Sequence, residues 1–144
     1  MSQYRNSREI PQKEDFLRLE GILGTKLPEE LRELYMSHNG GYPDLCLFTS
    51  STGIEYVLQE YLPIGSNDEM SVEWTLAEHE GFPRNLFPFA IDPGGNIFCL
   101  SMRSVDRGAV LFWDHEHFDT PDQSLTPVAP NLVTFISALK PDNI

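Results

Sequence analysis

Apolar residues recur along this chain at a helical spacing near both ends and in short strand-like runs between them. In residues 12–23 and 28–39 the apolar positions repeat every three or four residues, which predicts a pair of N-terminal helices. Pro28 suits the first turn of the second helix, and Asn-Gly-Gly at 39–41 favours its end. Residues 132–139 carry a similar apolar stripe, which predicts a C-terminal helix.

The central part of the chain alternates short apolar runs with turn residues, as expected of antiparallel strands. Asp-Pro-Gly-Gly-Asn at 92–96 and Asp-Arg-Gly at 106–108 supply turns, so the last three runs are predicted to form a meander. Pro88 lacks a backbone N–H, which predicts that its strand is not central in the sheet. The predicted extended segments are residues 45–48, 54–58, 61–64, 86–91, 97–102 and 109–113.

These elements predict an α+β fold with a mainly antiparallel sheet of about five to six strands, covered on one side by the N-terminal helix pair and the C-terminal helix. The segment before the meander is ambiguous. Ser66-x-x-Glu69 has the form of a helix capping box, and either a helix or an irregular acidic loop follows it up to Gly81. A length of 144 residues with 40% hydrophobic content predicts a single domain over 1–144, with a polar N-terminal segment at 1–10.

The two cysteines are too few for a disulfide framework, so we expect a reducing, cytoplasmic location. Cys46 and Cys99 both lie in apolar runs, where a free thiol behaves as a small inert hydrophobe. The first ten residues lack the apolar core of a signal peptide, and no run approaches the length of a membrane span.

The charge of the chain points to the kind of partner it would bind. A net charge of −12 disfavours nucleic acid and anionic membranes, because both are polyanions. Residues 33–83 contain no Lys or Arg, so their carboxylates are expected either to form an acidic face for a basic protein or simply to confer solubility. Trp74, within this stretch, would serve as an aromatic anchor for the partner or pack onto the sheet. The predicted partner-binding residues are Glu55, Glu60, Asp68, Glu69, Glu73, Trp74, Glu78 and Glu80.

Three ordered stretches carry a resemblance to a known family. They are the Leu-Pro-Glu-Glu-Leu to Asn-Gly-Gly stretch at 27–41, the strand–turn–strand at 89–100 and the Gly-Ala-Val-Leu-Phe-Trp-Asp-His-Glu stretch at 108–116. With the helix at 133–139, they are similar to the motifs of the SUKH superfamily of Smi/Knr-like domains. The similarity covers most of the chain from Pro11 onward, and the acidic stretch 66–81 is poorly matched.

The resemblance implies a non-catalytic α+β domain without a cofactor. Many bacterial members of the superfamily are immunity proteins that bind and neutralise a partner toxin, often a nuclease, and eukaryotic members are regulatory scaffolds. For this chain it therefore implies first an immunity protein with a basic toxin as partner, and second a scaffold domain in a larger assembly. The matched positions interpreted as structural are Asn39, Gly40, Gly41, Asp92, Gly94, Gly95 and Trp113.

One dense cluster of potential metal ligands follows the last meander strand. If residues 114–119 continue as a strand, His115, His117 and Asp119 point to one side, because alternate side chains share a face. Two imidazoles and a carboxylate suit a three-ligand zinc or non-haem iron site, which would make the chain a small metal-dependent enzyme. The other interpretation is a solvated strand end running into a loop, and we predict no bound metal.

Overall fold

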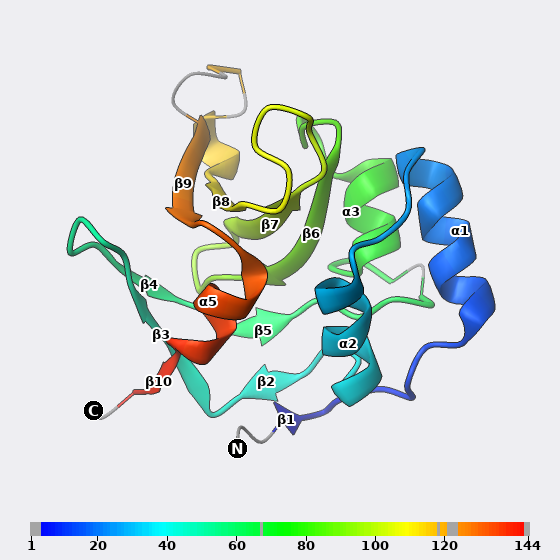
Figure 1. Cartoon of the computed structure of the whole chain (residues 1–144), viewed down its shortest axis with the longest axis horizontal. Helices are drawn as coiled ribbons and strands as arrows, with labels where there is room; N and C mark the ends of the chain where they lie inside the picture. Colours follow the sequence, from blue (N-terminus) through cyan, green and yellow to red (C-terminus); the bar gives the residue numbers. More distant parts are fainter. Residues whose placement is uncertain (1–3, 67, 118, 121–123, 143–144) are drawn as a thin grey trace.

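The computed structural model in Figure 1 describes residues 4–66, 68–117, 119–120 and 124–142. The helices are α1 (Lys13–Leu23), α2 (Glu29–Ser37), α3 (Val72–Glu78) and α5 (Leu132–Ser137), with a 3₁₀ helix η1 (His115–His117). The strands are β1 (Tyr4–Arg5), β2 (Tyr42–Pro43), β3 (Leu45–Thr49), β4 (Glu55–Val57), β5 (Glu60–Tyr61), β6 (Leu86–Ile91), β7 (Ile97–Ser101), β8 (Val110–Trp113), β9 (Leu125–Ala129) and β10 (Lys140–Pro141). The predicted α+β fold is confirmed.

The strands form a five-stranded antiparallel sheet in the order β5-β6-β7-β8-β9 and a three-stranded antiparallel sheet in the order β10-β3-β4. A small β1–β2 ladder ties the N-terminal segment to the chain that follows α2. In the meander, the Asp92 carboxylate accepts hydrogen bonds from the amides of Gly94 and Asn96 at 2.9 and 2.8 Å. The turn predicted at 92–96 is therefore confirmed, together with the side-chain chemistry that closes it.

Aromatic side chains fill the space between the two sheets and α5. The ring of Phe135 lies 4.8 Å from Phe48 in the smaller sheet and 5.9 and 5.5 Å from Phe89 and Phe98 in the larger one. Phe98 also contacts Phe112 at 5.2 Å on the neighbouring strand. These large rings, all of them buried except the half-buried Phe112, make α5 the cover of one face of the five-stranded sheet.

The opposite face of the same sheet is covered by α3 and the turn that follows it. Trp113 points away from Phe112 because successive strand residues alternate between faces. Its ring contacts His79 at 5.1 Å and Phe82 at 5.2 Å. Helical cover on one side was expected from the sequence, and α3 adds cover on the other.

A carboxylate holds α1 and α2 together. Glu20 accepts hydrogen bonds from the backbone amide of Leu27 at 2.8 Å and from the guanidinium of Arg32 at 2.6 Å. The amide hydrogen bond and the nearby cation keep the pKa of Glu20 below its ordinary value. The predicted helix pair thus forms a fixed unit.

Two local predictions are wrong. The strand with Pro88, β6, is not at the edge of the sheet, because it lies between β5 and β7. However, β5 pairs only with Ala90 and Ile91, the last two residues of β6. The missing N–H of Pro88 therefore costs no bond to β5, and the register with β7 shifts at this point.

The capping box at Ser66 does not begin a helix either. The acidic segment does form a helix, α3, but its N-cap is Ser71.

Candidate functional site

Asn39 joins three segments of the chain beside a surface cavity. Its side-chain amide donates to the carbonyls of Glu9 and Ile64, both at 2.9 Å, and its carbonyl oxygen accepts from the amide of Ile64 at 2.8 Å. The backbone of Arg8 bridges to that of Asn39 as well. One buried side chain therefore fixes the N-terminal segment against the end of α2 and the chain after β5.

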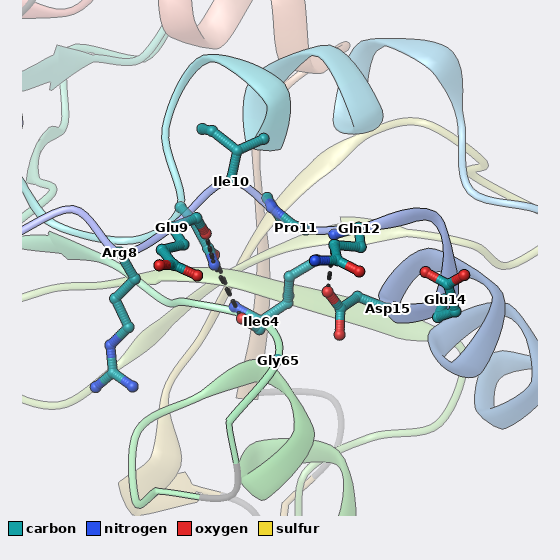
Figure 2. Close-up of a pocket in the computed structure, with 10 residues that line it drawn as sticks. Arg8, Glu9, Ile10, Pro11, Gln12, Glu14, Asp15, Ile64 and Gly65 are labelled. Atoms are coloured by element: carbon teal, nitrogen blue, oxygen red, sulfur yellow. Dashed lines mark hydrogen bonds between the residues drawn. The ribbon is translucent and has the colours of Figure 1, made fainter.

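The cavity, of about 500 Å³, lies where these segments meet the first turn of α1 (Figure 2). Its polar lining is mainly acidic, with Glu9, Glu14 and Asp15 beside Arg8. Asp15 also accepts a hydrogen bond from the amide of Gln12 at 2.8 Å, which closes the start of the helix. These carboxylates were missed by the sequence analysis because they lie outside the Lys- and Arg-free stretch.

Glu73, a predicted partner-binding residue, is buried beside this cavity. Its side chain is 8% exposed, and one carboxylate oxygen accepts from Arg18 at 2.6 Å and from the amide of Gly65 at 2.7 Å. Arg18 also contacts Asp15 at 3.1 Å, and the hydrogen bond to Glu73 is the main reason why the pKa of Arg18 is raised. Glu73 thus anchors α3 to α1 and lies beneath the surface.

Two further predicted residues lie near Arg8. Its guanidinium contacts Asp68 at 3.3 Å in a solvent-exposed ion pair, which contributes little stability. The pKa of Glu60 is raised because the side chain is partly buried, although a hydrogen bond from Tyr42 and the charge of Arg8 oppose the shift. Residues that are distant in sequence, Glu60, Asp68 and Glu73, are therefore gathered around two cations of the N-terminal segment and α1.

The remaining residues of the predicted acidic stretch lie along α3 and its flanking turns, apart from Glu55 on β4. Ser71 caps α3 by accepting a hydrogen bond from the amide of Trp74 at 3.1 Å. The half-buried Trp74 ring packs edge-on against His79 at 5.4 Å. Burial lowers the pKa of His79, although the charge of Glu69 favours its protonated form. We call the exposed residues Glu69, Glu78 and Glu80, together with Trp74, the α3 acidic surface.

Sequence comparison places this arrangement in a known family. The profile of the SMI1 / KNR4 family (SUKH-1) matches residues 11–138. This chain belongs to the SMI1 / KNR4 family. A relative is the SPbeta prophage-derived uncharacterized protein YokK of Bacillus subtilis (strain 168), which is 26% identical over 147 aligned positions that cover 88% of this chain and 73% of YokK.

The motifs that resembled SUKH proteins have structural roles in this SUKH-1 chain. Gly40 has a φ of +75°, and a Cβ there would lie 3.0 Å from the Cβ of Pro63. Asn39 forms the bonds described above, and Trp113 is fully buried under His79. No helix in the described part of the chain is long and apolar enough to cross a membrane.

The histidine cluster of this SUKH-1 chain is not arranged as predicted. His115 and His117 belong to η1, so the alternation of a strand does not apply to them. The Nδ1 atom of His115 lies 2.7 Å from the side-chain oxygen of Asn96, and His117 contacts Asp114 at 3.7 Å. Among the described residues, no three His, Cys, Asp or Glu side chains are grouped to hold a metal ion.

The thiols differ in their surroundings. Cys99 is fully buried in β7 and Cys46 is half-buried in β3, and both are free. Burial raises the pKa of each thiol, so neither is activated as a nucleophile.

Proposed function

We propose that this SUKH-1 chain is an immunity protein, a non-catalytic cytoplasmic domain that binds and neutralises a basic, nuclease-type toxin. The observation that carries the proposal is the α3 acidic surface. Glu69, Glu78 and Glu80 are exposed, and none of them has a salt bridge within the described part of the chain. Exposed carboxylates that form no salt bridge among the described residues are available to the cations of another protein.

The proposed mechanism is occlusion of a nucleic-acid-binding surface. A nuclease needs a positively charged surface to hold phosphates, and an acidic domain docked there would exclude its substrate. Complementary charge speeds association and disfavours other partners. Trp74 would supply apolar contact at the centre, since aromatic anchors surrounded by polar residues dominate many interfaces. The proposed partner-binding set also includes Glu55 on β4, Glu60 and Asp68, and the buried Glu73 holds α3 in position.

The test begins with capture of the partner from a lysate of the native host at low and high salt. A single basic protein that is retained at low salt and released at high salt is expected, and this chain should inhibit its nuclease activity. A multi-protein assembly that resists salt would instead favour the scaffold function.

Two triple variants with the same change in charge then locate the interface. Glu69→Gln, Glu78→Gln and Glu80→Gln together should weaken binding to the captured protein by about tenfold or more and flatten its salt dependence. The control combines Glu14→Gln, Glu29→Gln and Asp142→Asn and should bind nearly as well as the wild type. Equal affinity of the two triple variants would refute the assignment of the α3 acidic surface.

A further inference from the structure

A second surface, made by different helices, has the character of a docking groove. It lies between α2 and α5, encloses about 300 Å³, and is lined by Leu34, Leu132, Val133, Ile136, Glu30 and Glu33 among others. Figure 1 shows the two helices next to each other near the lower middle of the view. Both belong to the fixed framework, because α2 is joined to α1 and α5 is anchored by Phe135.

The floor and one wall of this α2–α5 groove are apolar. Leu34 and Leu132 are buried and close its floor, while Ile136 is half-buried and Val133 is 63% exposed. Val133 and Ile136 are three residues apart on α5, so they form a continuous ridge along the groove. Val133 contributes little to the core, so its side chain is free to contact an apolar side chain of a partner.

The opposite rim is acidic. Glu30 and Glu33 are also three residues apart on α2 and line the groove, and among the described residues that line it there is no Lys or Arg. In the described part of the chain, neither carboxylate takes part in a salt bridge. Glu30 lies in the first turn of α2, where its negative charge interacts favourably with the helix dipole. Glu33 lies beyond the first turn and has no such role.

We propose that the α2–α5 groove binds a basic amphipathic segment of a partner protein. Its apolar side chains would lie against Val133 and Ile136, and its Lys or Arg side chains would pair with Glu30 and Glu33. Charge complementarity selects this occupant, because the acidic rim and a net charge of −12 repel both a second copy of this chain and an anionic membrane. An amphipathic helix presenting anchors every three or four residues fits a groove between two helices. The inference goes beyond the proposed function, since it assigns a second surface that can fail while the first holds.

The probe is a synthetic Leu/Lys peptide of about 18 residues, or five helical turns, with all its leucines on one face. The control peptide has the same composition in a scrambled order, so that its leucines are distributed over all faces of the helix. Binding is followed by fluorescence anisotropy and by amide chemical shifts of isotope-labelled protein. We expect the amphipathic peptide to bind more tightly than its isomer and to shift the amides of Leu34, Ser37, Val133 and Ile136.

Surface variants decide whether the groove is responsible. Val133→Ser with Glu33→Gln should weaken peptide binding by about tenfold, since an apolar contact and a charge are both lost. The matched control, Val105→Ser with Glu116→Gln, makes the same two changes at exposed residues elsewhere and should bind as the wild type does. The triple variant of the α3 acidic surface should also bind the peptide normally, which separates this proposal from the proposed function.

Three results would overturn the proposal. They are equal binding of the two peptides, chemical shifts centred on Trp74, and unchanged affinity of the Val133→Ser/Glu33→Gln protein. Sedimentation provides a further test. A dimer of the free protein that Val133→Asp dissociates would assign the groove to a second copy of the chain.

Discussion

The guanidinium of Arg18 donates a 2.6 Å hydrogen bond to the carboxylate of Glu73 and so joins α1 to α3. Arg18 is 45% exposed whereas Glu73 is 8% exposed, so the pair lies at the boundary of the core. The same oxygen of Glu73 accepts from the amide of Gly65, which brings the chain before α3 into the network. This network fixes the position of the helix that carries the proposed toxin-binding surface.

Removing the cation should therefore destabilise the protein. Arg18→Met keeps most of the aliphatic stem but leaves the Glu73 carboxylate buried without its charged donor, and we expect the free energy of unfolding to fall by about 1.5–3 kcal/mol. Urea unfolding measures the change. In the control, Arg8→Met breaks the exposed contact with Asp68 and removes a charge near Glu60, and it should cost less than about 1 kcal/mol. Equal losses in the two variants would contradict a special role for the buried pair.

The side chain of Asn39 should be among the most sensitive polar positions. Asn39→Ala removes three hydrogen bonds to the backbone of Glu9 and Ile64 and leaves buried groups without partners. We expect a loss of about 2–4 kcal/mol in thermal or urea unfolding, against less than about 0.5 kcal/mol for the exposed Gln59→Ala. A small effect at Asn39 would mean that water replaces its hydrogen bonds without cost.

Two glycines with similar backbones separate conformational strain from steric clash. Gly40 and Gly53 have φ of +75° and +84°, but an added Cβ meets Pro63 only at Gly40 and open space at Gly53. Gly53→Ala should cost about 1–2 kcal/mol from the left-handed backbone alone, and Gly40→Ala should cost clearly more. The measurement is the urea concentration at the unfolding midpoint of each variant. If Gly53→Ala were as destabilising as Gly40→Ala, a steric clash at Gly40 would be refuted.

Stability should decrease in mild acid because of buried imidazoles. The ring of His38 stacks on Tyr4 at 3.6 Å, and burial lowers its pKa from the ordinary value. The unfolded chain takes up a proton near pH 6.5 and the folded chain resists it, so the free energy of unfolding should be maximal above about pH 6.5 and fall as the pH drops towards the lower folded pKa.

Replacement of the imidazoles tests this pH dependence. His38→Gln should reduce the decrease in the free energy of unfolding between about pH 7 and pH 5, whatever it does to the stability at neutral pH. Burial lowers the pKa of His79 too, so the double variant with His79→Gln should have the smallest slope. Urea unfolding at a series of pH values gives the slopes, and an unchanged slope in the double variant would contradict the assignment.

Features whose chemistry is local were predicted from the sequence. The turn at 92–96 is closed by the Asp92 carboxylate, which accepts hydrogen bonds from amides two and four residues further along the chain. The helix pair likewise follows from apolar spacing and from the proline and glycine residues at its ends. In each case the residues that determine the conformation are neighbours in sequence.

Other features depend on contacts that no local pattern reveals. Glu73 can be buried because Arg18, 55 residues away in sequence, supplies the positive charge that pairs with its carboxylate. Ser66 and Ser71 are both suitable N-caps, and the left-handed backbone of Met70, with a φ of +66°, delays the start of α3 to Ser71. At Asp114, the side chain accepts from the amide of Glu116, which favours a tight turn over the continued strand that the predicted metal cluster needed. The acidic partner surface remains a prediction.

The strand pairings differ greatly in how far apart their members lie along the chain. Short turns connect β6, β7 and β8, whereas β1 pairs with β2 across the whole helix pair and β10 reaches back to β3. Closing long loops costs chain entropy, so we expect the meander to assemble early in folding and the terminal strands to dock last. The hydrogen bonds of the Asn39 side chain to Glu9, and the cavity beside them, depend on the N-terminal segment, so they form only at that final step. A partner contacting Arg8 and Asp68 together would thus recognise only the fully folded chain.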